Sequence, residues 1–227
     1  MSGETALTIR RNFTRADPAL VMALGGYPSG YFADIQRRRG AMDCGIRPMF
    51  EAAPFVGSAL TIKSVPDDNL ACWAALDVIQ PGDVLLISCG GWTGSAVIGD
   101  LTVGMYKNAG ATAAVTDGMV RDVEGLEQIG LPIYARGLTP NSPQKNGPGE
   151  IGGEISIGGL TVRSGDIVMG DRDGIVILPQ NSFASALADI KGVQAKEANI
   201  EEAIAAGETK PQWVKEFLTG DCVREIK

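Results

Sequence analysis

The 227-residue sequence predicts an α/β sandwich with a mixed central sheet, and three observations lead to this prediction. Patterns typical of buried strands alternate with helical patterns through the middle of the chain. Between Glu154 and Pro179, short strand patterns follow one another with glycine turns between them. Strands separated by helices pair in parallel, whereas strands joined by tight turns pair antiparallel. Both kinds of pairing are therefore expected in one sheet, flanked by helices.

We expect one domain over residues 1–227. Its core should lie at about residues 57–179, after an N-terminal helical segment at 14–50 and before a C-terminal helix and tail at 181–227. The first 13 residues are polar, and they predict no regular element. The segment Pro140–Gly153 is rich in Pro, Gly and Asn, which indicates a loop.

The individual elements follow from apolar periodicity, helix-start residues and glycine stops. The first half of the chain predicts a helix begun by Asp17-Pro18, a short helix around Phe32–Arg38, a strand at Gly57–Ser64, a helix at Leu70–Ile79 and a strand at Val84–Cys89. The second half predicts a helix that carries Asp100, a strand at Ala111–Thr116, a helix opened by Arg121-Asp122, a strand at Pro132–Ala135, four strands within Glu154–Pro179, a helix capped by Asn181 that ends near Ala206 and a short helix around Trp213–Leu218.

Composition excludes several classes of protein. A net charge of −7 argues against a nucleic-acid binder, because affinity for phosphate backbones depends on clustered Lys and Arg. No apolar stretch is long enough to span a membrane. The four cysteines are widely spaced and no secretory signal precedes them, so we expect a cytoplasmic protein.

The absence of histidine is the strongest restriction on chemistry. It excludes Ser-His-Asp and Cys-His nucleophile systems and every metal site that contains histidine. A metal in this protein would be held by oxygen ligands, which favours Mg²⁺ or Mn²⁺ over zinc.

The stretch Gly90–Asp122 contains the candidate active site. Here strands are followed by helices, and in α/β folds ligands bind at such junctions, so Asp100, Arg121 and Asp122 should converge on one pocket. The glycines Gly90, Gly91 and Gly94 form neither a dinucleotide motif nor a phosphate loop. They either allow a tight turn only, or also expose backbone N–H groups to an anion.

Residue chemistry suggests a role for each of these side chains. Arg121 can bind a planar carboxylate with both arms of its guanidinium, and Asp100 and Asp122 are hard-oxygen ligands suited to magnesium. If a helix starts here, the amides of Leu101 and Thr102 could hold a carboxylate. The alternative for Arg121-Asp122 is an ordinary helix-start acid beside a solvated arginine. Asp173, in the sequence D-R-D-G, is interpreted as a turn residue.

The motifs around these residues resemble one family. The chain contains G-A-T-A-A-V-T-D-G-M-V-R-D-V-E-G-L, G-L-P-I-Y-A-R-G, P-G-D-V-L and D-R-D-G-I-V-I-L-P, within about residues 57–179. In these motifs it resembles the RraA-like family, which includes 4-hydroxy-4-methyl-2-oxoglutarate/4-carboxy-4-hydroxy-2-oxoadipate aldolases. The resemblance implies a swivelling β/β/α-type sandwich with flanking helices and a C-terminal helix. It also implies a homotrimer or homohexamer with a divalent metal at a subunit interface.

The resemblance further implies roles for individual residues. Asp122 matches the metal ligand, and Asp100 matches the acid that holds metal-bound water. Arg121 matches the substrate-binding arginine, and the backbone at Gly99, Leu101 and Thr102 matches the part that holds the pyruvate carboxylate. Glu197 matches a glutamate that reaches the metal site of a neighbouring subunit. Aldolases of the family commonly carry an acid three residues after the aspartate, where this chain has Gly125, so the particular substrate stays open.

The expected activity is that of a class II pyruvate-type aldolase that depends on Mg²⁺ or Mn²⁺. It would cleave the C3–C4 bond of a 4-hydroxy-2-oxo acid and would also decarboxylate oxaloacetate. The alternative is a regulator that binds an RNA-processing enzyme without catalysis, because the same family includes such proteins and a fold alone does not define a function.

Overall fold

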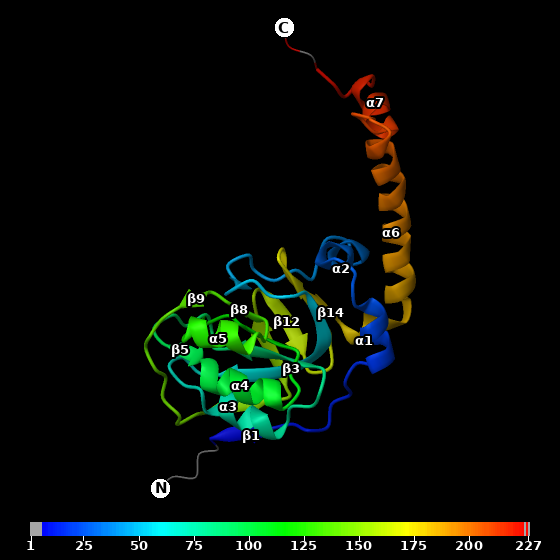
Figure 1. The fold of residues 1–227 in the computed structure, drawn as a ribbon. Coiled ribbons are helices and arrows are strands. Elements are labelled where there is room, and N and C mark those ends of the chain that lie inside the picture. Colours follow the sequence, from blue (N-terminus) through cyan, green and yellow to red (C-terminus); the bar gives the residue numbers. More distant parts are fainter. Residues whose placement is uncertain (1–5, 225, 227) are drawn as a thin grey trace.

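The centre of the structure is a mixed nine-stranded sheet, in a computed structural model that describes residues 6–224 and 226 (Figure 1). Four strands in its middle are parallel neighbours, in the order β3 (Phe55–Ser64), β4 (Asp83–Ser88), β6 (Ala113–Thr116) and β8 (Ile133–Ala135). On the other side of β3, the strand β13 (Ile167–Asp171) pairs antiparallel with β3 and with β14 (Gly174–Leu178). The mixed sheet is therefore confirmed. The predicted tail includes positions 225 and 227, which lie outside the described residues.

Two outer strands lie where the sequence predicted irregular structure. Leu7–Ile9 forms β1, and Gly149–Ile151 forms β10 within the predicted loop. The two strands pair in parallel, and β10 continues the sheet by pairing antiparallel with β3. Three-residue strands carry almost no periodicity, and their partners lie far away along the chain, so local sequence patterns cannot reveal them. A further edge strand, β2 (Arg47–Pro48), pairs with β8.

Both faces of the central sheet are buried, which explains why β4 is apolar along its whole length. Leu60, Ile62 and Leu85 belong to the core on one face, where the helices pack. The two sequence neighbours of Leu85, Val84 and Leu86, belong to the opposite core. The first face is covered by α3 (Leu70–Ala74), α4 (Asp100–Asn108) and α5 (Val123–Ile129), and the second by the hairpin of β11 (Glu154–Ile157) and β12 (Leu160–Arg163). This layering is the expected β/β/α sandwich.

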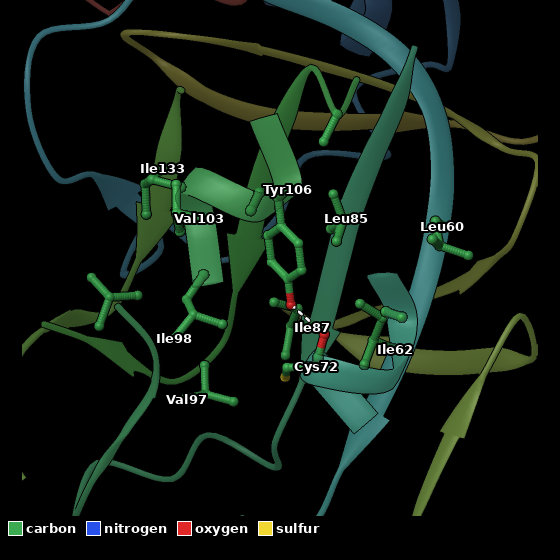
Figure 2. Packing of buried hydrophobic residues seen from close by; sticks show 14 of the residues in the cluster. Leu60, Ile62, Cys72, Leu85, Ile87, Val97, Ile98, Val103, Tyr106 and Ile133 are labelled. Atoms are coloured by element: carbon green, nitrogen blue, oxygen red, sulfur yellow. Dashed lines mark hydrogen bonds between the residues drawn. The ribbon is translucent and has the colours of Figure 1, made fainter. Parts of the chain in front are cut away.

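The helical face of the core fixes the position of α4. Tyr106 on α4 is fully buried, and its hydroxyl donates a hydrogen bond of 2.8 Å to the carbonyl of Cys72 on α3 (Figure 2). Leu85 and Ile87 of β4 lie beneath this contact. Truncating one such fully buried leucine to alanine costs about 2–5 kcal/mol, because apolar contact is lost and a cavity remains. The core therefore holds α3 and α4 firmly relative to each other.

A third group of helices packs on the antiparallel edge. It consists of α1 (Pro18–Leu24), α2 (Ser29–Ile35) and α6 (Phe183–Ala205), which bury Ile167, Met169, Val176 and Leu178. Asp17 caps α1 as expected, since its side chain accepts a hydrogen bond of 2.9 Å from the Ala19 amide. Asn181 does not cap α6: it lies inside a 3-10 turn, Gln180–Ser182, and α6 begins at Phe183. The first helical turn continues from that 3-10 turn, so no side-chain cap is present there.

The C-terminal part leaves the sandwich. Figure 1 shows α6 leading away from the sheet, with α7 (Gln212–Leu218) near its far end.

The helix predicted at Leu70–Ile79 is shorter than expected, because α3 ends at Ala74 and a 3-10 helix continues to Asp77. In the described part of the chain, no helix combines the length and the apolar character needed to cross a bilayer.

Candidate active site

The candidate residues lie at the ends of two neighbouring strands of a small separate sheet. This parallel sheet contains β5 (Ala96–Ile98), β7 (Met119–Val120) and β9 (Gly137–Leu138) in that order. β5 runs into α4 through Gly99, and β7 runs into α5 through Arg121 and Asp122. Because β5 and β7 are parallel neighbours, both junctions lie at the same edge, and the Arg121 amide donates to the carbonyl of Ile98 at 3.2 Å. The predicted convergence follows from this small sheet rather than directly from β4 and β6.

One pocket joins the two junctions. It encloses about 60 Å³. Six predicted residues line it: Gly99, Asp100, Leu101, Thr102, Arg121 and Asp122. The sequence therefore located the residues of one pocket correctly, although it assigned their supporting strands differently.

Asp122 has a backbone conformation that suits a functional rather than a capping role. It is in the left-handed region, with φ 60° and ψ 47°, and its side chain makes no capping hydrogen bond to α5. Instead, Asp122 Oδ2 lies 3.1 Å from Arg121 Nε. Strained backbone of this kind is often found where a side chain is aimed at a ligand. This geometry disfavours the alternative in which Asp122 is an ordinary helix-start acid.

The absence of a side chain at Gly99 leaves room for the carboxylate of Asp122. A Cβ at position 99 would lie 2.5 Å from Asp122 Oδ2 and 3.0 Å from Arg121 Cγ. Gly99 is also the residue before the first turn of α4, and as a glycine it has no side chain that could cap this turn. The Leu101 amide donates to Asp100 Oδ1 at 2.7 Å, while Thr102 is 3% exposed. A substrate carboxylate at this helix start would share the Leu101 amide with Asp100.

Arg121 is held from two directions. Its Nε pairs with Asp122, and its Nη1 donates a hydrogen bond to the hydroxyl of Ser142. The Arg121 side chain is 35% exposed and that of Asp122 is 40% exposed. A pair with this exposure contributes only about 0–1 kcal/mol to stability. The contact therefore orients the guanidinium more than it stabilises the fold.

Gly125, which stands where the resemblance implies an acid, lies against Asp100. A Cβ on Gly125 would be 2.7 Å from both Cβ and Oδ2 of Asp100. Any side chain at position 125 would therefore displace Asp100. In this chain the glycine allows α5 to approach the start of α4.

Seven further residues line the pocket, and the sequence did not point to them; those with polar groups in their side chains are Asn69, Trp73, Ser142 and Lys145. Ser142 and Lys145 come from the predicted loop, whose unusual length could have signalled a functional segment. Asp68 fixes this loop, because its buried carboxylate accepts from the amides of Leu70 at 2.9 Å and Gly147 at 3.0 Å. One buried acid thus connects the start of α3 to the loop beside the pocket.

The pocket suits a hard divalent cation. Magnesium in proteins is usually held by one or two carboxylates, with water and substrate oxygens as its other ligands. Asp100 and Asp122 supply two carboxylates, and the space beside Gly99 keeps the Asp122 oxygen accessible. Among residues 6–224 and 226, no group of three acidic or thiol side chains gathers as a metal site. From the described residues, this pocket therefore offers two acidic ligands.

Glu197 lies elsewhere in the same chain. It is on α6 and lines a hollow of about 520 Å³ between α2 and α6, together with Asp34, Arg37, Arg38 and Lys196. A hydrogen bond with Glu197 raises the pKa of Tyr31, on α2, to about 12. Within one chain Glu197 therefore does not meet Asp100 or Asp122. Its expected role across a subunit interface stays a prediction.

Thiol chemistry does not fit this region. Cys89 follows β4 and is buried. Burial and the nearby carboxylate of Asp117, 3.4 Å from Cys89 Sγ, together raise the pKa of the Cys89 thiol to about 12. A thiol with this pKa is not a thiolate nucleophile at neutral pH.

Fold and site together match one family of proteins. Residues 19–177 match the profile of the RraA-like family, described as Aldolase/RraA. The chain therefore belongs to the RraA-like family, and the resemblance found in the sequence motifs is confirmed.

Individual relatives give the same result. A Halalkalibacterium halodurans protein named "Putative 4-hydroxy-4-methyl-2-oxoglutarate aldolase" is 36% identical over 160 residues, which cover 70% of this chain and 76% of that protein. An uncharacterized protein from Pseudomonas syringae has the same fold, with a TM-score of 0.77 at 23% identity, over 87% of this chain and 97% of its own. A Streptomyces coelicolor member of the RNase ES inhibitor RraA protein family aligns with a TM-score of 0.73 at 27% identity, over 85% of this chain and all of its own.

Proposed function

We propose that this protein is a metal-dependent lyase that releases pyruvate by cleaving the C3–C4 bond of a 4-hydroxy-2-oxo acid. The observation that carries the proposal is the single pocket in which Asp100, Arg121 and Asp122 meet the start of α4. The similarity to a protein named as an aldolase supports the same reaction class. The enolate of pyruvate also forms when oxaloacetate loses CO₂, so we propose oxaloacetate decarboxylation as a second activity.

Asp122 and Asp100 would hold Mg²⁺ or Mn²⁺, which when bound acts as a Lewis acid that stabilises the negative charge of the enolate. We assign the substrate's C1 carboxylate to the start of α4, because the amides and the dipole at a helix start attract anions. Leu101 and Thr102 are the residues whose amides lie there.

Arg121 would bind the C2 oxygen as charge develops on it. Its contacts with Asp122 and Ser142 hold the guanidinium in one orientation before the substrate arrives. A donor that is already in place contributes most in the transition state, because it does not have to reorganise. Asp100 would hold a water molecule that carries the proton, since the chain has no histidine to do so.

We also propose that the site is completed by a second copy of the chain in a homotrimer or homohexamer. Within one chain two carboxylates line the pocket, and Glu197 lies on a helix that leads away from the sandwich (Figure 1). The far part of α6 and α7 exposes large apolar side chains, including Ile204 at 65% and Trp213 at 67%. Apolar surfaces of this kind are usually covered in an assembly. Cytoplasmic location and the absence of nucleic-acid or membrane partners are part of this proposal.

A direct experiment measures pyruvate release from 4-hydroxy-4-methyl-2-oxoglutarate and from oxaloacetate. We expect release with Mg²⁺ or Mn²⁺, complete loss in EDTA and recovery when the metal is restored. Full activity in excess chelator would contradict the metal dependence.

The second candidate function is a regulator of an RNA-processing enzyme, which the similarity to the RNase ES inhibitor RraA family favours. It predicts no pyruvate release from any 2-oxo acid under any metal condition. A screen of 2-oxo acids with both metals therefore separates the two candidates.

A further inference from the structure

Two buried polar atoms of the pocket have no hydrogen-bond partner. In the described part of the chain, Asn69 Oδ1 and Trp73 Nε1 are the buried side-chain nitrogen or oxygen atoms left without one. Both residues line the pocket of Asp100 and Asp122, and Asn69 is only 5% exposed. Native structures rarely leave such groups unsatisfied, because each costs about 1–3 kcal/mol of lost solvation. Both unsatisfied atoms belong to residues that line one pocket, which makes a bound ligand group a candidate partner for the pair.

The chemical nature of the two atoms is fixed. Asn69 Nδ2 donates to the carbonyl of Val97 at 3.0 Å, so exchanging the amide oxygen and nitrogen would place two acceptors together. Asn69 Oδ1 is therefore an acceptor, while the indole Nε1–H of Trp73 is only a donor. Residues four apart lie on the same side of a helix, and Asn69 directly precedes α3 while Trp73 lies within it.

The support beneath the pair is rigid. Asp68 accepts the Leu70 amide at the start of α3, and the hydroxyl of Tyr106 holds the carbonyl of Cys72 (Figure 2). α3 is thus tied to both the loop and α4. The two unsatisfied atoms are held in place by the fold and do not depend on a mobile segment.

A hydroxyl group satisfies both atoms at once, because it accepts a hydrogen bond from an N–H and donates one to a carbonyl oxygen. We propose that Asn69 and Trp73 bind the C4 hydroxyl of the substrate and so select 4-hydroxy-2-oxo acids. This assignment rests on the proposed lyase function and names the substrate group that the pocket recognises.

The pair would act at the bond that breaks. In cleavage, the C4 hydroxyl loses its proton to water and C4–O becomes a carbonyl. The C3–C4 electron pair becomes the enolate of pyruvate, and C3 then takes up a proton from water. The neutral Asn69 amide is not a base, so it positions the hydroxyl in the bound substrate. The N–H of Trp73 donates to the C4 oxygen, and this contact strengthens as the proton leaves and negative charge grows on that oxygen.

The experiment compares two substrates, because oxaloacetate has no C4 hydroxyl. For Trp73→Phe with Mg²⁺, we expect kcat/KM for 4-hydroxy-4-methyl-2-oxoglutarate to fall roughly tenfold further than kcat/KM for oxaloacetate, mainly in kcat. For Asn69→Ala, the preference for 4-hydroxy-4-methyl-2-oxoglutarate over oxaloacetate should also be lost, mainly through a higher KM for 4-hydroxy-4-methyl-2-oxoglutarate. The inhibition constant of oxalate, which resembles the enolate of pyruvate and lacks C4, should not change in Trp73→Phe.

The matched control is Trp92→Phe, because the indole nitrogen of Trp92 already donates to Ser95 Oγ at 3.1 Å and Trp92 does not line the pocket. The ratio of the two activities should stay at the wild-type value in this control. Equal changes in both reactions for Trp73→Phe and Asn69→Ala, in proteins with normal melting temperatures, would overturn the inference and assign the pair to an ordered water. A wild-type protein that releases pyruvate from neither substrate would overturn the proposed function itself, and the hydroxyl assignment with it.

Discussion

Two Arg-Asp dipeptides occur in the chain, Arg121-Asp122 and Arg172-Asp173, and the structure gives them different surroundings. Arg172-Asp173 forms the turn between β13 and β14, where the Asp173 amide donates to Asp171 Oδ1 at 3.0 Å. The Arg172 side chain is 84% exposed, and its nearest acid, Glu51, is 3.7 Å away. This turn is solvated, as the sequence predicted for Asp173.

Arg121-Asp122 instead follows a strand whose neighbour leads into a second strand–helix junction. Asp122 has a left-handed backbone, its carboxylate lies beside Gly99, and Ser142 holds Arg121 from the loop. The difference shows that the dipeptide itself carries little information. The distinguishing feature is the place in the fold, because Arg121-Asp122 lies at the edge of a parallel sheet, where a helix start and a second acid face it.

The largest expected effect comes from removing the charge of Asp122. Asp122→Asn should lower kcat/KM for oxaloacetate decarboxylation by at least about a hundredfold, since even residues that only orient metal ligands are worth 10–100-fold. Asp173→Asn, in the solvated turn, should leave kcat/KM within experimental error of the wild-type value. Equal losses in the two variants would remove the distinction between the dipeptides.

Arg121 should have an effect of similar size. Arg121→Ala should cost on the order of 3 kcal/mol, about a hundredfold in kcat/KM, with an almost unchanged melting temperature. Arg121→Lys should recover little, because lysine keeps the charge and loses the planar fork. Near-normal turnover in both variants, or loss of activity only through unfolding, would make Arg121 a structural residue.

Gly125→Ala tests the contact between α5 and Asp100. The new Cβ would be 2.7 Å from Asp100 Oδ2, so Asp100 must move and kcat should fall by roughly tenfold. Gly192→Ala is a suitable control, because a Cβ at that position on α6 meets no atom within 4 Å. Steady-state kinetics of the two alanine variants provide the comparison, and an unaffected Gly125→Ala enzyme would show that Asp100 need not be fixed.

A site shared between two chains predicts a gain of activity, smaller in size than the losses above, when two inactive variants are mixed. Glu197→Ala and Asp122→Ala should each be nearly inactive, but a randomly reassembled equimolar mixture of the two should recover about a quarter of wild-type activity, because one interface in four, averaged over all oligomers, combines two intact halves. Subunit mixing must be verified by mass spectrometry of differently tagged chains. Inactive mixed oligomers would place Glu197 outside the active site.

The sequence predicted most of the elements that build the core, because apolar patterns, Asp17 and the glycine stops act locally. It also identified Asp100, Arg121 and Asp122, whose positions follow strand ends. It missed β1 and β10, which depend on pairing between distant segments, and the small sheet of β5, β7 and β9, whose strands have only two or three residues.

Two pocket residues, Asn69 and Trp73, could not be predicted from the sequence, and for both the reason is the same. Asn69 directly precedes α3 and Trp73 lies within it. In a sequence, an asparagine before a helix indicates a cap and an apolar tryptophan indicates core packing. In the structure Asn69 makes no capping hydrogen bond, and its amide turns to Val97 and the pocket. Only the accounting of hydrogen bonds, which requires coordinates, distinguishes these residues from structural ones.

Metal binding is the most direct test of the account. Titration of the metal-free protein with Mn²⁺, followed by electron paramagnetic resonance, measures binding without any assumption about the substrate. We expect the wild type and Asp173→Asn to bind Mn²⁺ with the same affinity and Asp122→Asn to bind it at least about tenfold more weakly. Equal Mn²⁺ affinity in all three proteins would contradict the assignment of Asp122 as a metal ligand and the location of the active site at Arg121-Asp122.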